Sequence, residues 1–426
     1  MMVFSHKAMS LRKTTIVALC LGLLCSISFS KPLIWKECVA SALQNNLDLR
    51  KAQESLKQYE LAVEAANSSL SPQLNGSAGA SHSKSTSETH QDSYILGLSA
   101  SQLLFDGAKT QLNLDKSRLE FQANRAAYQV ASAALRNNLR KAYIEVQQYQ
   151  ELLRISYIVQ SRRKQQYELI FLKYEAGREH KGSLLKSKAS LTQAEQNGSS
   201  TQRTLELKQK KFASELGITD ANLLFVSDNL SPSSLSISVD LTVLSLGSPY
   251  YLQYKLEKLG RDMALKSAQA NQGASLQANA NYGLSDTLFF PQNNSWSLGL
   301  SGSYPFWDGG NRQSQTQVAQ SQLKVASMNE TVAYKTVLMN LEEAKVNYLN
   351  AKSRVVVDAQ FLEASEERSR IAEVQYTTGQ LSYDSWMLIE NELVADQEAL
   401  VNAKVALLNA EASWILAKGG TLEDEK

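Results

Sequence analysis

The sequence contains few cysteines, histidines and prolines. Two of its three cysteines fall in an apolar N-terminal segment, so Cys38 alone would remain in a mature chain and could form no internal disulfide. The four histidines fit no HExxH pattern, and neither a GxSxG nor a phosphate-loop motif is present, so we predict no enzyme and no catalytic, cofactor or metal site. The six prolines avoid the long helical tracts described below, where each would cost about 3 kcal/mol.

Long apolar runs are also missing. Beyond residue 30 no run approaches the roughly eighteen residues of a transmembrane helix. Residues 1–30 have the pattern of a secretory signal peptide: a basic start, apolar residues 16–29, and small Ser28 and Ser30 before the cut. Each cysteine in this segment follows a leucine, which disfavours the alternative of a lipoprotein. An exported chain of this kind is periplasmic, secreted or inserted as strands.

Neither sign of charge dominates. The signal peptide takes three basic residues with it, which leaves 41 (44 − 3) against 42 acidic ones. This balance gives no electrostatic case for binding nucleic acid.

The second half of the chain repeats the first at a constant offset of 202 residues. Residues 93–107 and 295–309 are identical at eight of fifteen positions, and the same offset pairs Gly177 with Gly379. Two copies of one structural unit are therefore expected. The predicted domains are repeat one (31–216), a small equatorial linker domain (217–248), repeat two (249–418) and a short acidic tail (419–426).

Each repeat is expected to contain a very long helix and a return helix. The helical tracts span 110–175, 182–216, 312–377 and 384–417. At 1.5 Å per residue, the longer pair would reach about 100 Å. Apolar residues step by four and three from Leu135 to Leu153 and, in the same register, from Val337 to Val355, which predicts coiled-coil packing. A kink or fraying is expected at the Asn-Gly-Ser-Ser of 197–200.

Four segments alternate between apolar and small polar residues: about 73–83, 93–104, 275–285 and 295–306. In the third, Leu276 and Ala278 alternate with Gln277 and Asn279. One interpretation is a soluble antiparallel sheet with its apolar face on a core. The other is a membrane barrel with lipid outside and water inside. The strand length of about ten residues favours the barrel.

Aromatic residues bracket these segments, as the two interfaces of a membrane barrel require. The expected interface aromatics are Tyr94 and Trp296 at one end and Phe105, Tyr304, Phe306 and Trp307 at the other. The connecting loops 82–92 and 285–294 are polar or turn-prone. Four side chains in the first loop could bind a metal loosely, although a solvated serine-rich loop is the favoured interpretation. These are His82, Glu88, His90 and Asp92.

Four strands are too few to close a barrel, because the smallest has about eight. A membrane barrel would therefore be shared between chains, with eight strands from two copies or twelve from three. Only the larger leaves a water-filled lumen, and the periodicity alone does not choose between them.

Together these features resemble the TolC-type outer membrane efflux proteins. Over residues 33–418, each repeat carries two strands, a Phe/Trp-Asp-Gly turn, a very long helix and a Tyr-x-x-Gly break. The sharpest motifs are Leu-Phe-Asp-Gly (104–107), Phe-Trp-Asp-Gly (306–309), Tyr-Glu-Ala-Gly (174–177) and Tyr-Thr-Thr-Gly (376–379). The family usually has proline where this chain has Leu47. The resemblance implies an α+β membrane fold: a homotrimer whose twelve-stranded transmembrane β-barrel, four strands per chain, continues into a long periplasmic α-helical coiled-coil barrel.

The resemblance also implies partners. In such proteins the helix–turn–helix tips meet a periplasmic adaptor protein, which links the duct to an inner membrane pump, while the barrel contacts outer membrane lipid. By position, the adaptor-contacting tips are Gly177, Gly379, Gln380 and Leu381. A helix reversal needs a residue that adopts positive φ, so the alternative interpretation is that the two glycines are merely helix C-caps.

One departure from the family concerns the periplasmic gate. Family members usually carry an acidic residue six positions after the tip glycine, where this chain has Ser183 and Ser385. Asp384 lies one residue early, about 100° around the helix. We expect closure by an ion pair instead, between a basic residue of the first tip (Arg178 or Lys181) and an acidic residue of the second (Asp384 or Glu373). The gate candidates are Arg178, Lys181, Glu373, Tyr376 and Asp384.

The favoured function is a passive trimeric duct of a tripartite export system, located in the outer membrane with a large periplasmic portion. It would carry small molecules such as drugs and toxic compounds from the periplasm to the exterior. One alternative is a type I protein secretion duct. A second is a non-conducting periplasmic coiled-coil spacer, against which the polar strand face argues, since a spacer needs no polar inner wall.

Overall fold

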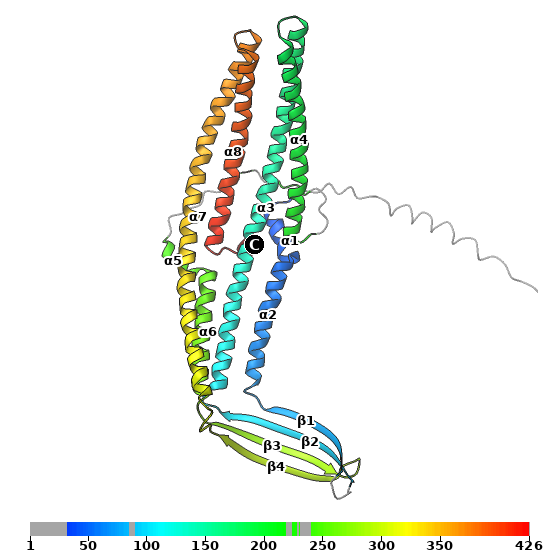
Figure 1. Cartoon of the computed structure of the whole chain (residues 1–426), viewed down its shortest axis with the longest axis vertical. Helices are drawn as coiled ribbons and strands as arrows, with labels where there is room; N and C mark the ends of the chain where they lie inside the picture. Colours follow the sequence, from blue (N-terminus) through cyan, green and yellow to red (C-terminus); the bar gives the residue numbers. More distant parts are fainter. Residues whose placement is uncertain (1–31, 85–89, 219–223, 228–229, 231–239, 426) are drawn as a thin grey trace, which may run out of the picture.

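The computed structural model describes residues 32–84, 90–218, 224–227, 230 and 240–425. Long helices run side by side, and a four-stranded sheet lies across one end (Figure 1). The first half contains α1 (Trp35–Asn45), α2 (Leu47–Ser68), β1 (Gln73–Lys84), β2 (His90–Phe105), α3 (Lys109–Glu175) and α4 (Lys181–Leu216). The second contains α5 (Leu241–Gly247), α6 (Pro249–Ala270), β3 (Ser275–Asp286), β4 (Asn293–Ser303), α7 (Asn311–Thr377), α8 (Tyr383–Ala417) and the 3-10 helix η1 (Glu423–Glu425). The signal peptide predicted for 1–30 lies outside the described residues.

The two halves keep the 202-residue offset element by element. α3 and α7 each have 67 residues, and both their first residues (109 and 311) and their last (175 and 377) differ by 202. The left-handed glycines obey the same offset: Gly107 and Gly309, Gly177 and Gly379, Gly217 and Gly419. The first helix of repeat one is divided into α1 and α2, and α5 and α6 are divided at the equivalent position of repeat two.

Asn46 makes that division. Its side-chain oxygen accepts hydrogen bonds from two backbone N–H groups in the first turn of α2, and its amide donates to the carbonyl oxygen of Glu215 at the end of α4 (2.9 Å). Leu47 is the first residue of α2, and its counterpart at the first position of α6 is Pro249. Proline suits this position because the N–H that it lacks has no partner within a helix.

The long helices pack through the predicted heptad seams. In repeat one, Leu139 and Val146 of α3 are fully buried with Phe212 of α4. In repeat two, the equivalent core consists of Val337, Leu341, Ala344 and Trp414. None of the helices in the described ranges combines the length and the apolar character that a bilayer crossing needs.

The fraying expected at 197–200 is wrong, because α4 runs through these residues without a break. Gly198 is buried against α3, and a Cβ on it would lie 3.7 Å from the hydroxyl oxygen of Ser156. The hydroxyls of Ser199 and Thr201 donate to carbonyl oxygens four residues earlier. Packing and these local bonds hold the helix despite its weak intrinsic propensity.

The C-terminal segment 419–425 packs against the protein instead of projecting as a free acidic tail. Leu422 is fully buried in the core of repeat one. Glu423 accepts a hydrogen bond from the Tyr128 hydroxyl (2.8 Å), and Glu425 pairs with the buried guanidinium of Arg136. The segment therefore ties the end of repeat two to α3 of repeat one.

The expected linker domain is described only in part. Leu33 and Val226 form a parallel β-bridge, and α5 packs on α7 and α6. α1 and α5 both lie near the middle of the long helices (Figure 1).

Candidate functional site: the two-faced sheet and the helical tip

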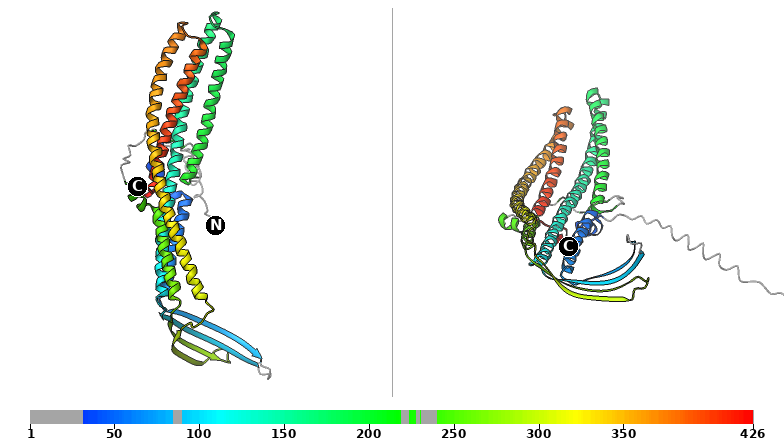
Figure 2. Two further views of the ribbon diagram at one scale, coloured as in Figure 1. Left: turned by 60° about the vertical axis from the view of Figure 1, so that its left-hand side comes forward. Right: turned by 60° about the horizontal axis from the view of Figure 1, so that its bottom comes forward.

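The four strands form one antiparallel sheet in sequence order, which curves from edge to edge (Figure 2). Successive residues of a strand point to opposite faces, so each row across the sheet belongs to one face. One row runs Leu74, Ala100, Ala280, Leu298; the next runs Asn75, Ser99, Asn281, Ser297. The apolar face has no cover within the chain, since Leu74 and Leu298 are 74% and 77% exposed. The predicted separation into an apolar and a polar face is thus present across all three ladders.

Two strand ends differ from the prediction. A bulge between Leu103 and Phe105 in β2 shifts the side-chain alternation and places Phe105 opposite Leu276. β4 ends at Ser303 instead of residue 306, because Ser303 already pairs with the first residue of β3 and Pro305 has no N–H to donate. Tyr304, Phe306 and Trp307 therefore follow the strand, and all three are exposed.

The predicted interface aromatics do lie at the two ends of the strands. Near the loops, the Tyr94 ring contacts Phe289 edge to face, with centroids 5.4 Å apart, and Trp296 is exposed opposite Tyr282. At the end nearer the helices, Phe105 is 55% exposed.

The strands also extend into the loop predicted for 82–92. His82 pairs with Asp92 in the ladder, and the His82 Nδ1 lies 2.6 Å from a carboxylate oxygen of Asp92. Glu88 lies outside the described residues. Among those that are described, no three His, Cys, Asp or Glu side chains gather as a metal site would require.

At the opposite end, the hairpins α3–α4 and α7–α8 finish in what we call the helical tip, residues 170–190 and 372–392. Gly177 and Gly379 adopt φ of 69° and 81°, and a Cβ on either would meet no atom within 4 Å. Glycine is therefore favoured at both turns by the positive φ and not by close packing, and neither turn is covered by other atoms. Gln380 is exposed, whereas Leu381 packs partly against the apolar core of the tip.

Tyr376 lies at the centre of that core and joins the two hairpins. Its ring stacks on Trp386, and the Lys173 ammonium of α3 lies 4.0 Å from its centroid while donating to its carbonyl oxygen (2.9 Å). Its hydroxyl donates to a carboxylate oxygen of Glu179 in the first turn region (3.0 Å). Of the gate candidates, Tyr376 is the one that bridges the hairpins through both its backbone and its side chain.

The hydrogen bond between the Glu179 carboxylate and the Tyr376 hydroxyl shifts the pKa of both groups. Burial raises the pKa of Glu179, but hydrogen bonds from the His180 backbone and the Tyr376 hydroxyl outweigh it, so the net pKa is lowered. Burial, and then the hydrogen bond to Glu179, raises the pKa of Tyr376. At neutral pH the carboxylate is therefore charged and the phenol is protonated, as donation requires.

Within the chain, one gate candidate forms an ion pair with a residue outside the predicted set. Asp384 pairs with Lys186 of α4 (2.7 Å), and this hydrogen bond lowers the pKa of Asp384. Arg178, Lys181 and Glu373 are exposed and make no ion pair within the described part of the chain. Lys186 reaches Asp384 because it lies further along α4 than Lys181, beside the first turn of α8.

The sequence prediction also missed a buried polar cluster behind the tip. The Arg163 guanidinium donates to Gln166 (2.8 Å), whose amide donates to Glu390 of α8 (3.0 Å), which also accepts from Ser369 of α7. Arg163 and Glu390 are only 6% and 5% exposed. A signal was available: Arg163 lies seven residues before buried Ile170, and Glu390 seven after buried Tyr383, so both are polar residues in apolar heptad positions.

Comparisons with known proteins agree with this architecture. Residues 38–217 match the model of the family described as "Outer membrane efflux protein". The chain is 20% identical to the outer membrane efflux protein BepC of Brucella suis biovar 1 (strain 1330), over 91% of this chain and 85% of BepC. It is 24% identical to the cation efflux system protein CusC of Escherichia coli (strain K12), over 90% and 86%.

The fold is also that of solved outer membrane channels. The open-state MtrE channel of Neisseria gonorrhoeae superposes with a TM-score of 0.82 at 18% identity, covering 91% of this chain and 89% of MtrE. Its kind of architecture, a β-barrel continued by a long helical barrel, accounts for both the two-faced sheet and the extended hairpins. Residues 38–217 thus resemble the outer membrane efflux protein family, and the whole chain has the fold of solved outer membrane channels.

Proposed function

We propose that three copies of this chain form a passive duct for small molecules, coupled through a periplasmic adaptor to an inner membrane pump. The observation that carries the proposal is the polar face of the sheet. Across all four strands it consists of Ser, Asn, Gln and Gly apart from Ile95 and Leu103, and it has no charged side chain. Such a wall suits a water-filled lumen that does not hold its cargo.

The sheet supports the trimer because both edge strands, β1 and β4, lack an outer neighbour within the chain. Closure joins β4 of one chain to β1 of the next. Three chains give twelve strands, enough for a lumen that side chains do not fill, whereas eight strands would be plugged.

The helices also support the trimer, because equivalent residues of α3 and α7 differ in their exposure. α3 packs against α6 and α8 within the chain, and its Ala123 and Ile144 are 3% and 0% exposed. Their counterparts on α7, Val325 and Val346, are 54% and 53% exposed. The exposed α7 stripe has a strict seven-residue spacing: Val318, Val325, Val332, Met339 and Val346. We assign this stripe to contacts with α2 and α4 of the next chain, which are the repeat-one equivalents of α6 and α8.

The helical tip is the proposed gate and adaptor contact. Tyr376, Glu179 and Lys173 hold the two hairpins together, and exposed Arg178, Lys181 and Glu373 are free to pair with a neighbouring chain or with the adaptor. The open turns at Gly177 and Gly379, with Gln380 and Leu381, offer the adaptor a surface without steric obstruction. The aromatics Tyr94, Phe105, Trp296, Tyr304 and Trp307 are proposed to lie at the two membrane interfaces.

A dye-accumulation assay tests the proposal. Cells that lack this chain should accumulate a fluorescent efflux substrate, and the intact gene should reverse this. Gly379→Trp should fail to complement, whereas Gly379→Asn should succeed, because asparagine tolerates positive φ and adds little bulk. Equal accumulation with and without the chain would contradict small-molecule efflux, and secretion of protein would then be measured in the same strains.

A further inference from the structure

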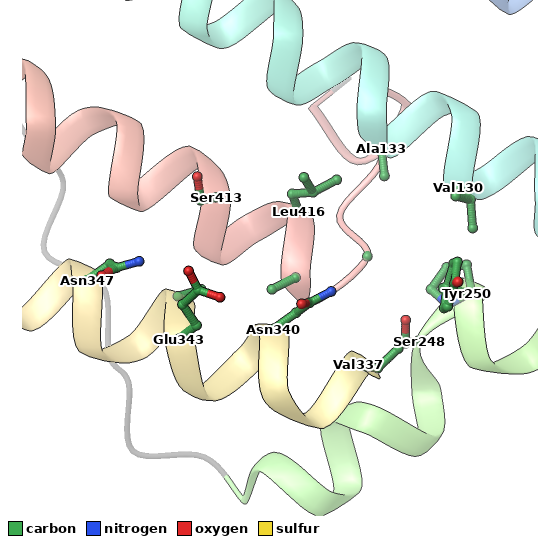
Figure 3. Close-up of a pocket in the computed structure, with 14 residues that line it drawn as sticks. Val130, Ala133, Ser248, Tyr250, Val337, Asn340, Glu343, Asn347, Ser413 and Leu416 are labelled. Atoms are coloured by element: carbon green, nitrogen blue, oxygen red, sulfur yellow. The ribbon is translucent and has the colours of Figure 1, made fainter. Parts of the chain in front are cut away.

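A pocket of about 400 Å³ opens at the waist of the molecule, between α3 and α7, where α8 ends and α6 begins (Figure 3). Val130 and Ala133 of α3 face Asn340 and Glu343 of α7 across it. The end of α8, with Leu416, forms a third side. This volume falls within the range of small-molecule sites. We call it the junction pocket.

Comparison with repeat one explains why the pocket is open. At the equivalent junction between α4 and α2, Asn46 caps α2 and donates to the last turn of α4, so one amide closes the gap between the two helix ends. The residue 202 positions later is Ser248, which makes no side-chain cap on α6. Its hydroxyl is too short to bridge the junction, and the space that the amide fills in repeat one is left free.

The side of the junction pocket at Ser248 and the start of α6 presents hydrogen-bond donors. Ser248 is only 3% exposed and lines the pocket, yet its hydroxyl bonds to none of the described residues. The first turn of α6 behind it also receives no side-chain cap, which leaves donors and the positive end of the helix dipole at this side. The Ser248 hydroxyl and the uncapped N–H groups of α6 can therefore donate to an incoming hydrogen-bond acceptor.

The opposite side has the reverse polarity. Glu343 is the only charged residue among those that line the pocket, and it forms no ion pair within the described ranges. Beside it lies the C-terminal end of α8, where the negative end of the helix dipole also favours a cation. In repeat one the equivalent position carries Lys141, so the negative charge is specific to this junction. Between the two polar sides the lining combines apolar Val130, Val337 and Leu416 with the amide of Asn340 (Figure 3).

We propose that the junction pocket binds a small amphipathic amine that also carries a hydrogen-bond acceptor. The cationic nitrogen pairs with Glu343 beside the end of α8. The acceptor oxygen receives a hydrogen bond from the Ser248 hydroxyl at the start of α6, and the apolar body contacts α3. The inference is independent of the proposed cargo, because binding is measured on the isolated protein and efflux is measured in cells.

The test uses the purified full-length protein in detergent and rhodamine 6G, a cation with an apolar ring system and an ester carbonyl. Fluorescence anisotropy should show saturable binding of one dye per chain. Glu343→Gln should weaken binding about tenfold. Ser248→Asn, which restores the repeat-one cap, should weaken it at least as much by filling the pocket. The matched control is Glu342→Gln, which removes the same charge one residue away and should change the affinity less than twofold.

Retention of the wild-type melting temperature and elution volume by each variant would exclude misfolding as the cause. Binding of fluorescein, an anion of similar size, with equal affinity would overturn the proposal. So would equal losses in Glu343→Gln and Glu342→Gln, which would show general attraction to a negative surface. Absence of saturable dye binding would show that the pocket is closed in the assembled protein and would also overturn it.

Discussion

Tyr376 and Trp386 stack at the helical tip with ring centroids 4.5 Å apart and planes inclined by 17°. The stack fixes the ring of Tyr376 while its hydroxyl reaches Glu179 of the other hairpin. Packing and hydrogen bonding can therefore be separated by substitution.

Tyr376→Phe should keep the stack and lose only the hydrogen bond. A hydrogen bond to a charged carboxylate contributes about 1.5–3 kcal/mol, so the ratio of closed to open tips should fall by about 10- to 150-fold. Single-channel conductance in planar bilayers would measure the open fraction. The matched control is Tyr174→Phe at the equivalent position of repeat one, where the tyrosine hydroxyl bonds to none of the described residues. Equal effects of the two substitutions would contradict a specific latch at Tyr376.

The latch should also respond to acid. The folded pKa of Glu179 lies below its ordinary value of 4.5, so its stabilisation is fully present above that pH and is lost as the pH falls through the folded pKa. We expect the open fraction to rise below pH 4.5 and to stay constant between pH 6 and 8. Glu179→Gln should open the tip at neutral pH and abolish this acid response. A rise in the open fraction on acidification that persists unchanged in Glu179→Gln would refute it.

The two faces of the sheet should differ sharply in their tolerance of charge. Leu298 and Ser297 are neighbours in β4 that belong to the apolar and polar faces respectively. Leu298→Lys should impair assembly in the membrane, since a lysine facing lipid costs about 2–4 kcal/mol near the bilayer midplane. Ser297→Lys should assemble normally and shift ion selectivity toward anions. Heat-modifiable mobility of outer membrane fractions would report assembly, and a reversed order of the two variants would assign the faces the other way round.

The buried cluster behind the tip should matter more than nearby surface pairs. Glu390→Ala leaves Gln166 and Ser369 without their acceptor in a buried site, which should destabilise the protein by about 2–4 kcal/mol. Glu392→Ala, two residues away, breaks an exposed pair with Arg368 and should cost less than about 1 kcal/mol. Thermal or urea unfolding of the two variants would compare them directly. A similar loss for both would show that the cluster is no more than a surface pair.

Most of the fold could be predicted because the sequence patterns that specify it involve neighbouring residues or occur in both repeats. Heptad spacing in α3 and α7 and alternation in the strands each depend on neighbouring residues, and the 202-residue offset states every element twice. Proline and aromatic residues then marked the element ends to within a few positions. The bulge beside Phe105 was missed because it depends on how β2 pairs with β3, which the sequence of β2 alone does not contain.

The site was harder because its contacts are distant in the chain. The Tyr376 hydroxyl meets Glu179, 197 residues earlier, and Gln166 meets Glu390, 224 residues later. Composition identified 419–426 only as a short acidic tail and did not indicate its partners, Arg136 and Tyr128 on α3. Only the relative rotation of the two hairpins decides that Lys186, and not Lys181, reaches Asp384.

The docked segment 419–425 has a consequence for assembly. Within one chain, the contact between α3 and α8 forms in a unimolecular step, at a rate independent of concentration. Segment 419–425 stabilises this contact, because it follows α8 and bonds to α3. The proposed contact between α7 and the next chain forms only on collision and follows mass action. A closed ring of three chains therefore alternates three intrachain contacts, which do not depend on protein concentration, with three interchain contacts, which do. Dilution should dissociate the trimer into monomers in which both hairpins remain packed together.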